Sequence, residues 1–193
     1  MIKLVKNRSW NKLKKALLVI DYTEDFVALD GALTCGEPGV ELEGYITSLT
    51  KKFLDGEHFV VMPVDVHDID DPYHPETKQF PPHNIRGTEG RNLYGSLQQL
   101  YERNQEKIHW MDKTRFSAFA GTDLELLLRA RGITELHLVG VCTDICILHT
   151  SVDAYNQGFN IVIHERGVAS FDPVGHEWAL RHFENTLGAK IIH

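Results

Sequence analysis

The sequence predicts an α/β protein of three layers, in which helices cover both faces of a mostly parallel six-stranded sheet. Short apolar runs alternate along the chain with stretches of helical periodicity. The apolar runs are nearly continuous, as expected of strands that are buried on both faces. Because each right-handed crossover between parallel strands places a helix over the sheet, this alternation indicates helices on both faces.

Each expected strand is an apolar run that a polar or helical segment follows. The six runs are residues 16–22, 59–66, 107–111, 135–141, 160–164 and 189–193. The expected helices are residues 40–55, 93–103, 124–131, 145–157 and 177–187. Helix ends are expected at Gly132 and Gly158, and N-terminal caps at Thr122 or Asp123 and at Thr143 or Asp144.

One domain spanning residues 1–193 is expected, because this length suits one full core and is short for two. Hydrophobic content of 42% and charged content of 24% are ordinary globular values. The net charge of −7 argues against a nucleic-acid surface, which needs clustered lysines and arginines. No run reaches the roughly 18 apolar residues of a membrane-spanning helix, so we expect no membrane segment.

Residues 1–14 are expected to form a basic extension ahead of the first strand. The cations that precede any acidic residue are Lys3, Lys6, Arg8, Lys12, Lys14 and Lys15. We favour a solvated extension over a membrane or RNA arm. The apolar run at 16–20 is too short for a secretory signal. With an odd number of cysteines and no such signal, reduced thiols in the cytoplasm are expected.

Reactive side chains follow the predicted strands at their carboxyl ends, where open parallel sheets bind ligands. Asp21 ends the first strand, Lys113 follows the third, and Cys146 follows the fourth. A thiol, a carboxylate base and a cation that stabilises the thiolate are the set that nucleophilic catalysis requires. Cys146 begins a predicted helix, whose N-terminus favours a thiolate.

Each of these residues also has a purely structural interpretation. A free cysteine such as Cys146 is usually a small buried hydrophobe. Asp21 could cap a helix or form a salt bridge, and Lys113 could be a solvated lysine. Cys142 is interpreted as a structural or lining residue, with a redox pair of Cys142 and Cys146 as the alternative.

A long irregular segment, residues 65–91, follows the second strand and is rich in proline. Loops of this length inside a compact domain tend to be functional. Asp65 and His67 are two residues apart on extended chain, so both point to the same side. A mixed nitrogen and oxygen set suits zinc, manganese or iron. The candidate ligands are Asp65, His67, Glu76 and His83, with His74 as a competing ligand.

These residues resemble the motifs of the isochorismatase-like cysteine hydrolases. The matching segments are residues 18–26 (LVIDYTEDF), Lys113 with residues 117–119 (SAF), and residues 139–146 (VGVCTDIC). The similarity runs from about Lys15 to the end of the chain. Asp65 and His67, together with residues 80–83 (FPPH), narrow it to the nicotinamidases and pyrazinamidases.

The resemblance implies hydrolysis of nicotinamide to nicotinate and ammonia through a cysteine thioester, a step of NAD salvage. The implied triad is Asp21, Lys113 and Cys146, and the implied metal ligands are Asp65, His67, Glu76 and His83. A divalent metal, zinc before manganese or iron, would orient the pyridine ring. The expected substrate-binding residues are Phe26, Phe80, Phe116 and Cys142. We expect a small aromatic amide as substrate, neither nucleic acid nor membrane as partner, and a homo-oligomer.

The family pattern also implies a cis peptide between Val141 and Cys142, whose surroundings would supply an oxyanion hole. The chain departs from the pattern at two places. Thr23 and Glu24 replace the commoner Gln-Asn pair. Glu76 stands where many members have no ligand, which leaves the fourth ligand open between this residue and His74.

Three rival functions stay open from the sequence. One is a related cysteine hydrolase for a carbamoyl or ureido compound, which would not need the metal segment. Another is a metallohydrolase that uses metal-bound hydroxide and leaves Cys146 as a bystander. The third is a non-enzymatic, redox-responsive binding domain that uses Cys142 and Cys146.

Overall fold

The computed structural model describes residues 14–193, so the N-terminal extension other than Lys14 lies outside the described residues. Within this part of the chain, six strands form one sheet in the order β3-β2-β1-β4-β5-β6. All neighbouring strands pair in parallel. The strands are β1 Lys15–Ile20, β2 Phe59–Asp65, β3 Ile108–Lys113, β4 Glu135–Val141, β5 Asn160–Ala169 and β6 Lys190–Ile192.

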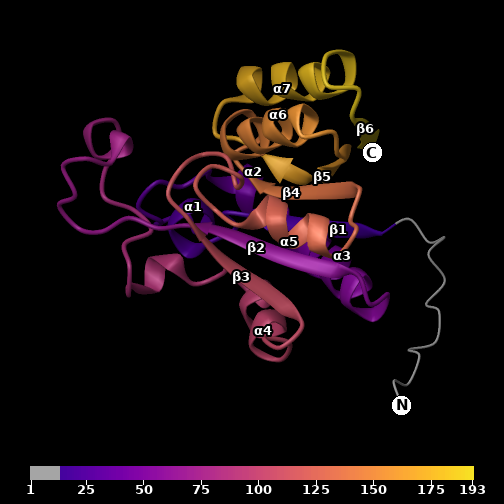
Figure 1. Ribbon diagram of the computed structural model, residues 1–193. Coiled ribbons are helices and arrows are strands. Elements are labelled where there is room, and N and C mark those ends of the chain that lie inside the picture. The colour runs from indigo at the N-terminus through magenta and orange to yellow at the C-terminus, as the bar shows by residue number, and fades with distance from the viewer. Residues whose placement is uncertain (1–13) are drawn as a thin grey trace.

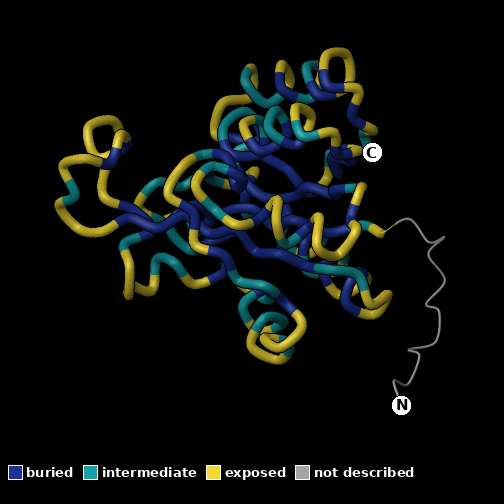
Figure 2. The backbone as a smooth tube through the Cα atoms, in the orientation of Figure 1, coloured by how far each residue is buried: buried dark blue, intermediate teal, exposed yellow. Residues whose placement is uncertain are grey.

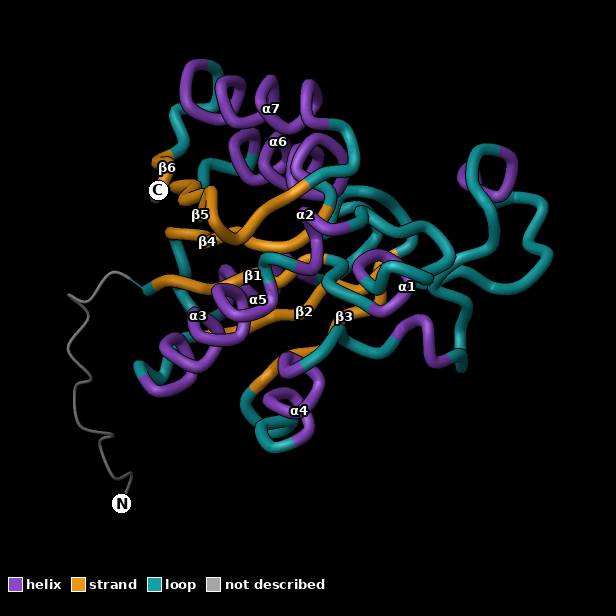
Figure 3. Tube along the Cα trace, turned by 180° about the vertical axis from the view of Figure 1, so that it is seen from behind, coloured by secondary structure: helices purple, strands orange, loops and turns teal. Residues whose placement is uncertain are grey.

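Helices flank the strands on both sides, with α6 and α7 near β4 and β5 and α4 beside β3 (Figures 1 and 3). The α-helices are α1 Glu24–Val27, α2 Glu37–Val40, α3 Glu43–Asp55, α4 Ser96–Glu102, α5 Leu124–Ala130, α6 Leu148–Asn156 and α7 Pro173–Asn185. Shorter helices are η1 Pro75–Lys78, η2 Glu89–Arg91 and the π-helix η3 Thr143–Ile147. The predicted three-layer α/β class is confirmed.

The core is divided by the sheet into two apolar clusters. Successive residues of β1 point to opposite faces, so Leu17 and Val19 pack with α1, α3 and α4, while Leu18 and Ile20 pack with α5, α6 and α7. The strands are therefore buried on both faces, and they appear as the dark interior of Figure 2. No helix of residues 14–193 is long and apolar enough to cross a membrane.

The strand β5 is longer than predicted and ends at Ala169 rather than at His164. Glu165 and Arg166 interrupt the apolar run, which is why the sequence suggested an earlier end. A register shift between β4 and β5 accommodates these residues, and pairing resumes where Gly140 lies opposite Val168.

Several helix starts also differ from the prediction: α3 begins at Glu43 rather than residue 40, and α4 begins at Ser96 rather than residue 93. Helix α7 begins at Pro173 instead of residue 177, because Asp172 caps it by accepting from the backbone N of Val174 at 3.0 Å. The predicted cap at Thr143 or Asp144 is wrong, because η3 already begins at Thr143 and the Asp144 carboxylate accepts from Ser170 Oγ at 2.6 Å.

The predicted glycine ends agree with the structure, and of the two predicted caps Asp123 occupies the N-cap position of α5 without a side-chain hydrogen bond, while Thr122 supplies one. Thr122 Oγ1 accepts from the backbone N of Leu124 at 3.3 Å. Gly132 and Gly158 follow helices α5 and α6 with φ of 64° and 75°, which favour glycine.

Candidate active site

Four reactive side chains from separate elements converge at the carboxyl end of the sheet. Asp21 directly follows β1, Asp65 ends β2, Lys113 ends β3, and Cys146 lies in η3 after β4. The backbone of Asp21 is left-handed, with φ of 56°, and its N–H donates to Pro63 O at 3.0 Å. This conformation is unfavourable for a residue with a side chain and is typical of functional sites.

The amine of Lys113 lies at the centre of this group. Its Nζ is 2.7 Å from Asp21 Oδ2, 3.5 Å from Asp65 Oδ1 and 3.7 Å from Cys146 Sγ. Lys113 is 1% exposed, so the interpretation as a solvated lysine is wrong. The Asp21 carboxylate is held from its other oxygen, which accepts from the backbone N of Asp65 at 2.8 Å.

Burial and ion pairing have opposing effects on the pKa values of Asp21 and Lys113. Burial raises the pKa of Asp21 to about 6, although the Lys113 ammonium opposes the shift. Burial acts to lower the pKa of Lys113, but the facing Asp21 and Asp65 carboxylates hold it well above its usual value. A carboxyl group whose pKa lies near neutrality is suited to take and return a proton.

The thiol of Cys146 differs from the sequence expectation. The helix N-terminus suggested a resting thiolate, yet burial raises the pKa of Cys146 well above its usual value despite the nearby Lys113 ammonium. A nucleophilic thiolate therefore requires that a base remove its proton. Asp21 is the candidate, because its carboxylate lies 2.7 Å from the same Lys113 ammonium that is 3.7 Å from Cys146 Sγ.

Beside this group lies a cluster of metal-ligand side chains. Asp65, His67, Glu76 and His83 each present one ligand atom, and these atoms lie within 4.8 Å of one another. The Asp65 carboxylate contacts both imidazoles, at 2.7 Å from His67 Nε2 and 3.7 Å from His83 Nε2. His83 Nε2 is also 3.5 Å from Glu76 Oε2.

Glu76 and His74, the two candidates for the fourth ligand, lie differently in the structure. Both ring nitrogens of His74 are engaged by backbone groups, Nε2 with Thr114 O at 2.8 Å and Nδ1 with the backbone N of Glu76 at 3.2 Å. The His74 ring packs edge-on against His67, with ring centroids 4.2 Å apart. It is Glu76, on η1, that turns its carboxylate toward the cluster.

The chemistry of this cluster fits a divalent cation. Asp65 Oδ1 and His83 Nε2 are buried and have no hydrogen-bond partner within the described residues. Burial would lower the pKa of His83, yet the facing Asp65 and Glu76 carboxylates raise it to about 10. The group thus attracts positive charge, and its two nitrogen and two oxygen donors are of the type that zinc and related metals prefer.

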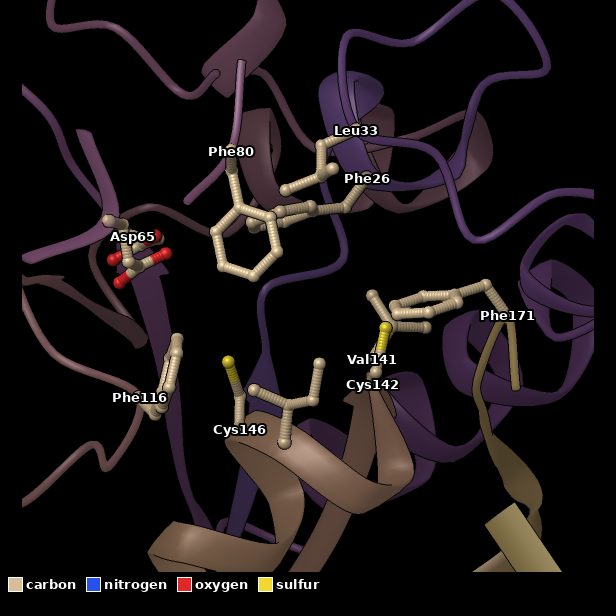
Figure 4. A pocket seen from close by; sticks show the side chains of 11 residues that line it. Phe26, Leu33, Asp65, Phe80, Phe116, Val141, Cys142, Cys146 and Phe171 are labelled. Atoms are coloured by element: carbon tan, nitrogen blue, oxygen red, sulfur yellow. The ribbon is translucent and has the colours of Figure 1, made fainter. Parts of the chain in front are cut away.

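Residues of both groups line one largely apolar pocket (Figure 4). Asp65, Glu76 and Cys146 line it. In Figure 4 Cys146 lies at the bottom of the pocket, with Phe80 and Phe26 above it and Phe116 on the side of Asp65. The four predicted substrate-binding residues all line this pocket: Phe26, Phe80, Phe116 and Cys142.

Sequence reasoning missed other lining residues, among them Leu33 and Phe171. Phe171 comes just after the true end of β5 at Ala169, so a correct strand boundary would have placed it among the strand-end residues. Leu33 lies in an irregular segment after α1, where no pattern in the sequence marks it. As the family pattern implied, the Val141–Cys142 peptide bond is cis.

Known proteins resemble the chain along most of its length. The model of the isochorismatase domain matches residues 15–193. PncA of Bacillus subtilis (strain 168), named an uncharacterized isochorismatase family protein, is 61% identical over 181 residues, which cover 93% of this chain and 99% of that protein.

Solved structures show the same relationship. The crystal structure of nicotinamidase/pyrazinamidase PncA from Bacillus subtilis is 62% identical with a TM-score of 0.92, covering 93% of this chain and 100% of that one. Pyrazinamidase of Pyrococcus horikoshii, solved in complex with zinc, is 26% identical with a TM-score of 0.83, covering 93% and 99%.

Proposed function

This chain belongs to the isochorismatase family and is a hydrolase of that family, and we propose that it is a nicotinamidase, which converts nicotinamide and water to nicotinate and ammonia. One observation carries the proposal. The Cys146 thiol, with the Lys113 ammonium 3.7 Å away, and two members of the metal-ligand cluster, Asp65 and Glu76, meet at the same aromatic pocket. A flat ring with a nitrogen atom and a carboxamide matches these three features together.

The pocket favours a neutral aromatic amide over a charged substrate. The phenylalanines supply apolar walls for a flat ring, Phe26 and Phe80 from above and Phe116 from the side of Asp65 in Figure 4. An enol-ether dianion such as isochorismate would instead meet the carboxylates of Asp65 and Glu76. Nicotinamide and pyrazinamide both present a ring nitrogen and a neutral carboxamide, so both are proposed substrates.

In the first half-reaction, Asp21 removes the proton of Cys146 and Lys113 stabilises the thiolate from 3.7 Å. The sulfur attacks the carboxamide carbon, and the negative charge that forms on oxygen is held by the backbone N–H groups of Cys142 and Cys146. Such donors contribute roughly 3 kcal/mol each to the transition state. Asp21 then protonates the leaving nitrogen, ammonia departs, and a thioester remains.

In the second half-reaction, Asp21 takes a proton from water, whose oxygen attacks the thioester carbon. The C–S bond breaks, Asp21 returns its proton to the Cys146 sulfur, and the acid that leaves releases the second water proton to solvent to become nicotinate. The pKa of Asp21, raised to about 6 by burial, suits a group that both accepts and donates a proton in one cycle.

The metal ligands proposed are Asp65, His67, Glu76 and His83. When bound there, a divalent metal supplies a Lewis-acid contact that orients the ring nitrogen. Zinc is the metal we propose first, with manganese and iron as alternatives, and the zinc-bound Pyrococcus horikoshii relative supports this choice.

Ammonia release from nicotinamide, pyrazinamide and benzamide, together with pyruvate release from isochorismate, tests the proposal. Nicotinamide and pyrazinamide should turn over, while benzamide, which lacks the ring nitrogen, should react far more slowly. Equal rates with benzamide would refute the contact between metal and ring. Turnover of isochorismate without amide hydrolysis would refute the nicotinamidase activity itself.

A further inference from the structure

The segment between β2 and α4 is exposed except at a few positions. From residue 68 to residue 91 the buried residues are His74, Glu76, His83 and Asn84. This segment projects from the end of the sheet in Figure 1, and its outer turns are exposed in Figure 2. The first three of these residues lie in or against the metal-ligand cluster. Asn84 has no place in that cluster, although it is completely buried.

Three hydrogen bonds join Asn84 to two distant parts of the chain. Its backbone N donates to Asp25 Oδ2 at 2.7 Å, and its Oδ1 accepts from Thr23 Oγ1 at 3.0 Å. Its carbonyl O accepts from the backbone N of His67 at 3.1 Å. Asn84 is also bonded covalently to His83, so it connects two candidate ligands to the segment around α1.

The conformation of Asn84 shows that this arrangement carries a cost. Its φ of 43° is left-handed, which asparagine tolerates better than most residues. Its Nδ2 is buried and has no hydrogen-bond partner within residues 14–193. A buried amide that leaves one group unpaired usually has a specific role.

The Asp25 carboxylate holds the same segment at a second point. A Cβ added to Gly90 would lie 2.1 Å from Asp25 Oδ2, so the absence of a side chain at Gly90 allows the close approach. Asp25 therefore touches the segment at Asn84 and again six residues later. Thr23 and Asp25 both follow the end of β1. Their side chains hold in place the segment that supplies Glu76 and His83.

We propose that Asn84 is a positioning residue for the metal site, and that its hydrogen bond with Thr23 sets the affinity for the metal. The inference rests on the proposed function, because it takes the four-residue cluster as the metal site. Few apolar side chains anchor this segment, so hydrogen bonds must fix the relative positions of His67 and His83. When a residue that orients a metal ligand through hydrogen bonds is removed, the metal affinity typically falls by about 10- to 100-fold.

The most selective variant is Asn84→Gly. Glycine adopts the left-handed backbone without strain and can keep both backbone hydrogen bonds, while the side-chain bond to Thr23 is lost. Thr23→Val removes the same bond from the other side with little change in volume. We expect each variant of the full chain to bind Zn²⁺ roughly tenfold more weakly in a chelator-competition titration. The double variant should be no weaker than either single variant, because all three lack one bond.

A matched control distinguishes positioning from general stability. Thr47 Oγ1 and Ser96 Oγ form a hydrogen bond of 3.1 Å between α3 and α4, away from the metal-ligand cluster. Thr47→Val should lower the melting temperature and leave the Zn²⁺ affinity unchanged. Thr23→Ser, which keeps the hydroxyl, should restore the affinity that Thr23→Val loses.

Unchanged Zn²⁺ affinity in Thr23→Val overturns the proposal, whatever happens to its melting temperature. The proposal is also overturned if the losses of Zn²⁺ affinity add in the double variant, or if the wild-type protein binds no Zn²⁺. If Asn84→Gly does not fold, the comparison of Thr23→Val with Thr23→Ser decides. Failure to hydrolyse nicotinamide, with the Zn²⁺ affinities changed as expected, would overturn the nicotinamidase function and leave the role of Asn84 intact.

Discussion

Two polar clusters, one buried and one partly buried, lie at different places on the same sheet, and they differ in how completely their atoms are hydrogen-bonded. The strand-end cluster consists of Asp21, Asp65, Lys113 and Cys146. The histidine cluster consists of Tyr45, Glu135, His137 and His164, on the α3 side of β4 and β5. Both bury groups that are expensive to remove from water.

The histidine cluster forms an unbroken chain of hydrogen bonds. His164 bonds with Tyr45 OH and with His137 Nδ1, both at 2.8 Å, and His137 Nε2 bonds with Glu135 Oε1 at 3.0 Å. Burial, with His137, Lys15 and Lys52 nearby, lowers the pKa of His164 to about 4, so its ring is neutral near pH 7.

The strand-end cluster is charged, and Asp65 Oδ1 forms an ion pair with Lys113 at 3.5 Å but has no hydrogen-bond partner among the described residues. The difference teaches that burial alone does not mark a functional site. We expect a polar chain with every ring nitrogen paired to serve stability, and a charged group with unpaired atoms beside a pocket to bind and react. The following experiments test this distinction.

The largest expected effect is that of Cys146→Ala, which removes the nucleophile. Ammonia release from nicotinamide should fall by roughly three orders of magnitude or more. Cys142→Ala is the matched control and should lose far less, with the fold retained in both by circular dichroism. Near-normal turnover by Cys146→Ala would show that the thiol is a bystander.

Asp21→Asn should be nearly inactive, because one base serves both half-reactions. A general acid–base group commonly contributes roughly 10²- to 10⁴-fold, and here the contribution enters twice. Rates of ammonia release and of thioester breakdown, measured separately, should both fall. A near-normal rate in either step would assign that proton to another group.

His67→Ala should lower metal occupancy by removing one of the four proposed ligands. Elemental analysis of the purified variant should find less metal, and excess metal should raise the melting temperature of the wild type by mass action more than that of the variant. The Cys146 thiol should still react with an alkylating agent. Full metal occupancy in His67→Ala would remove this residue from the site.

Unlike the three variants above, His164→Gln should lower the stability of the protein and leave its activity nearly unchanged. Breaking the hydrogen-bond chain leaves buried partners unpaired and should reduce the free energy of unfolding by about 1–3 kcal/mol in urea titrations. The kcat for nicotinamide should stay within about twofold of wild type, because the cluster does not touch the pocket. A large loss of kcat at normal stability would refute the division of roles.

The smallest expected effect is a dependence of the free energy of unfolding on pH, through the protonation of His164. In the folded protein the pKa of His164 is about 4, against the ordinary 6.5. The unfolded chain binds a proton in this window and the folded chain does not, so stability falls as the pH drops from 6.5 toward 4. After a discount for solvent screening, we expect His164 to account for about 2 kcal/mol. The stability difference between wild type and His164→Gln should therefore shrink over this range, and a constant difference would contradict the assignment.

Local pattern alone was enough to predict the six strands, the three-layer class and the strand-end residues. A strand buried on both faces has to be a continuous apolar run, so β4 was predicted with its true bounds, Glu135–Val141. Parallel strands bring their carboxyl ends to one edge, so Asp21, Lys113 and Cys146 were expected to meet. Both inferences depend only on the residues of a strand and on those that directly follow it.

What only the tertiary structure decided involves contacts between distant segments. The extension of β5 past Glu165 depends on pairing with β4, and without it Phe171 could not be placed in the pocket. The sequence left Glu76 and His74 open because both are metal-ligand types at similar spacing. Their positions differ because the His74 ring hydrogen-bonds with the carbonyl O of Thr114, which lies forty residues away in the chain. The Glu76 carboxylate faces the cluster instead. Residue type and spacing specify what a side chain can do, and the three-dimensional packing specifies which partner it meets.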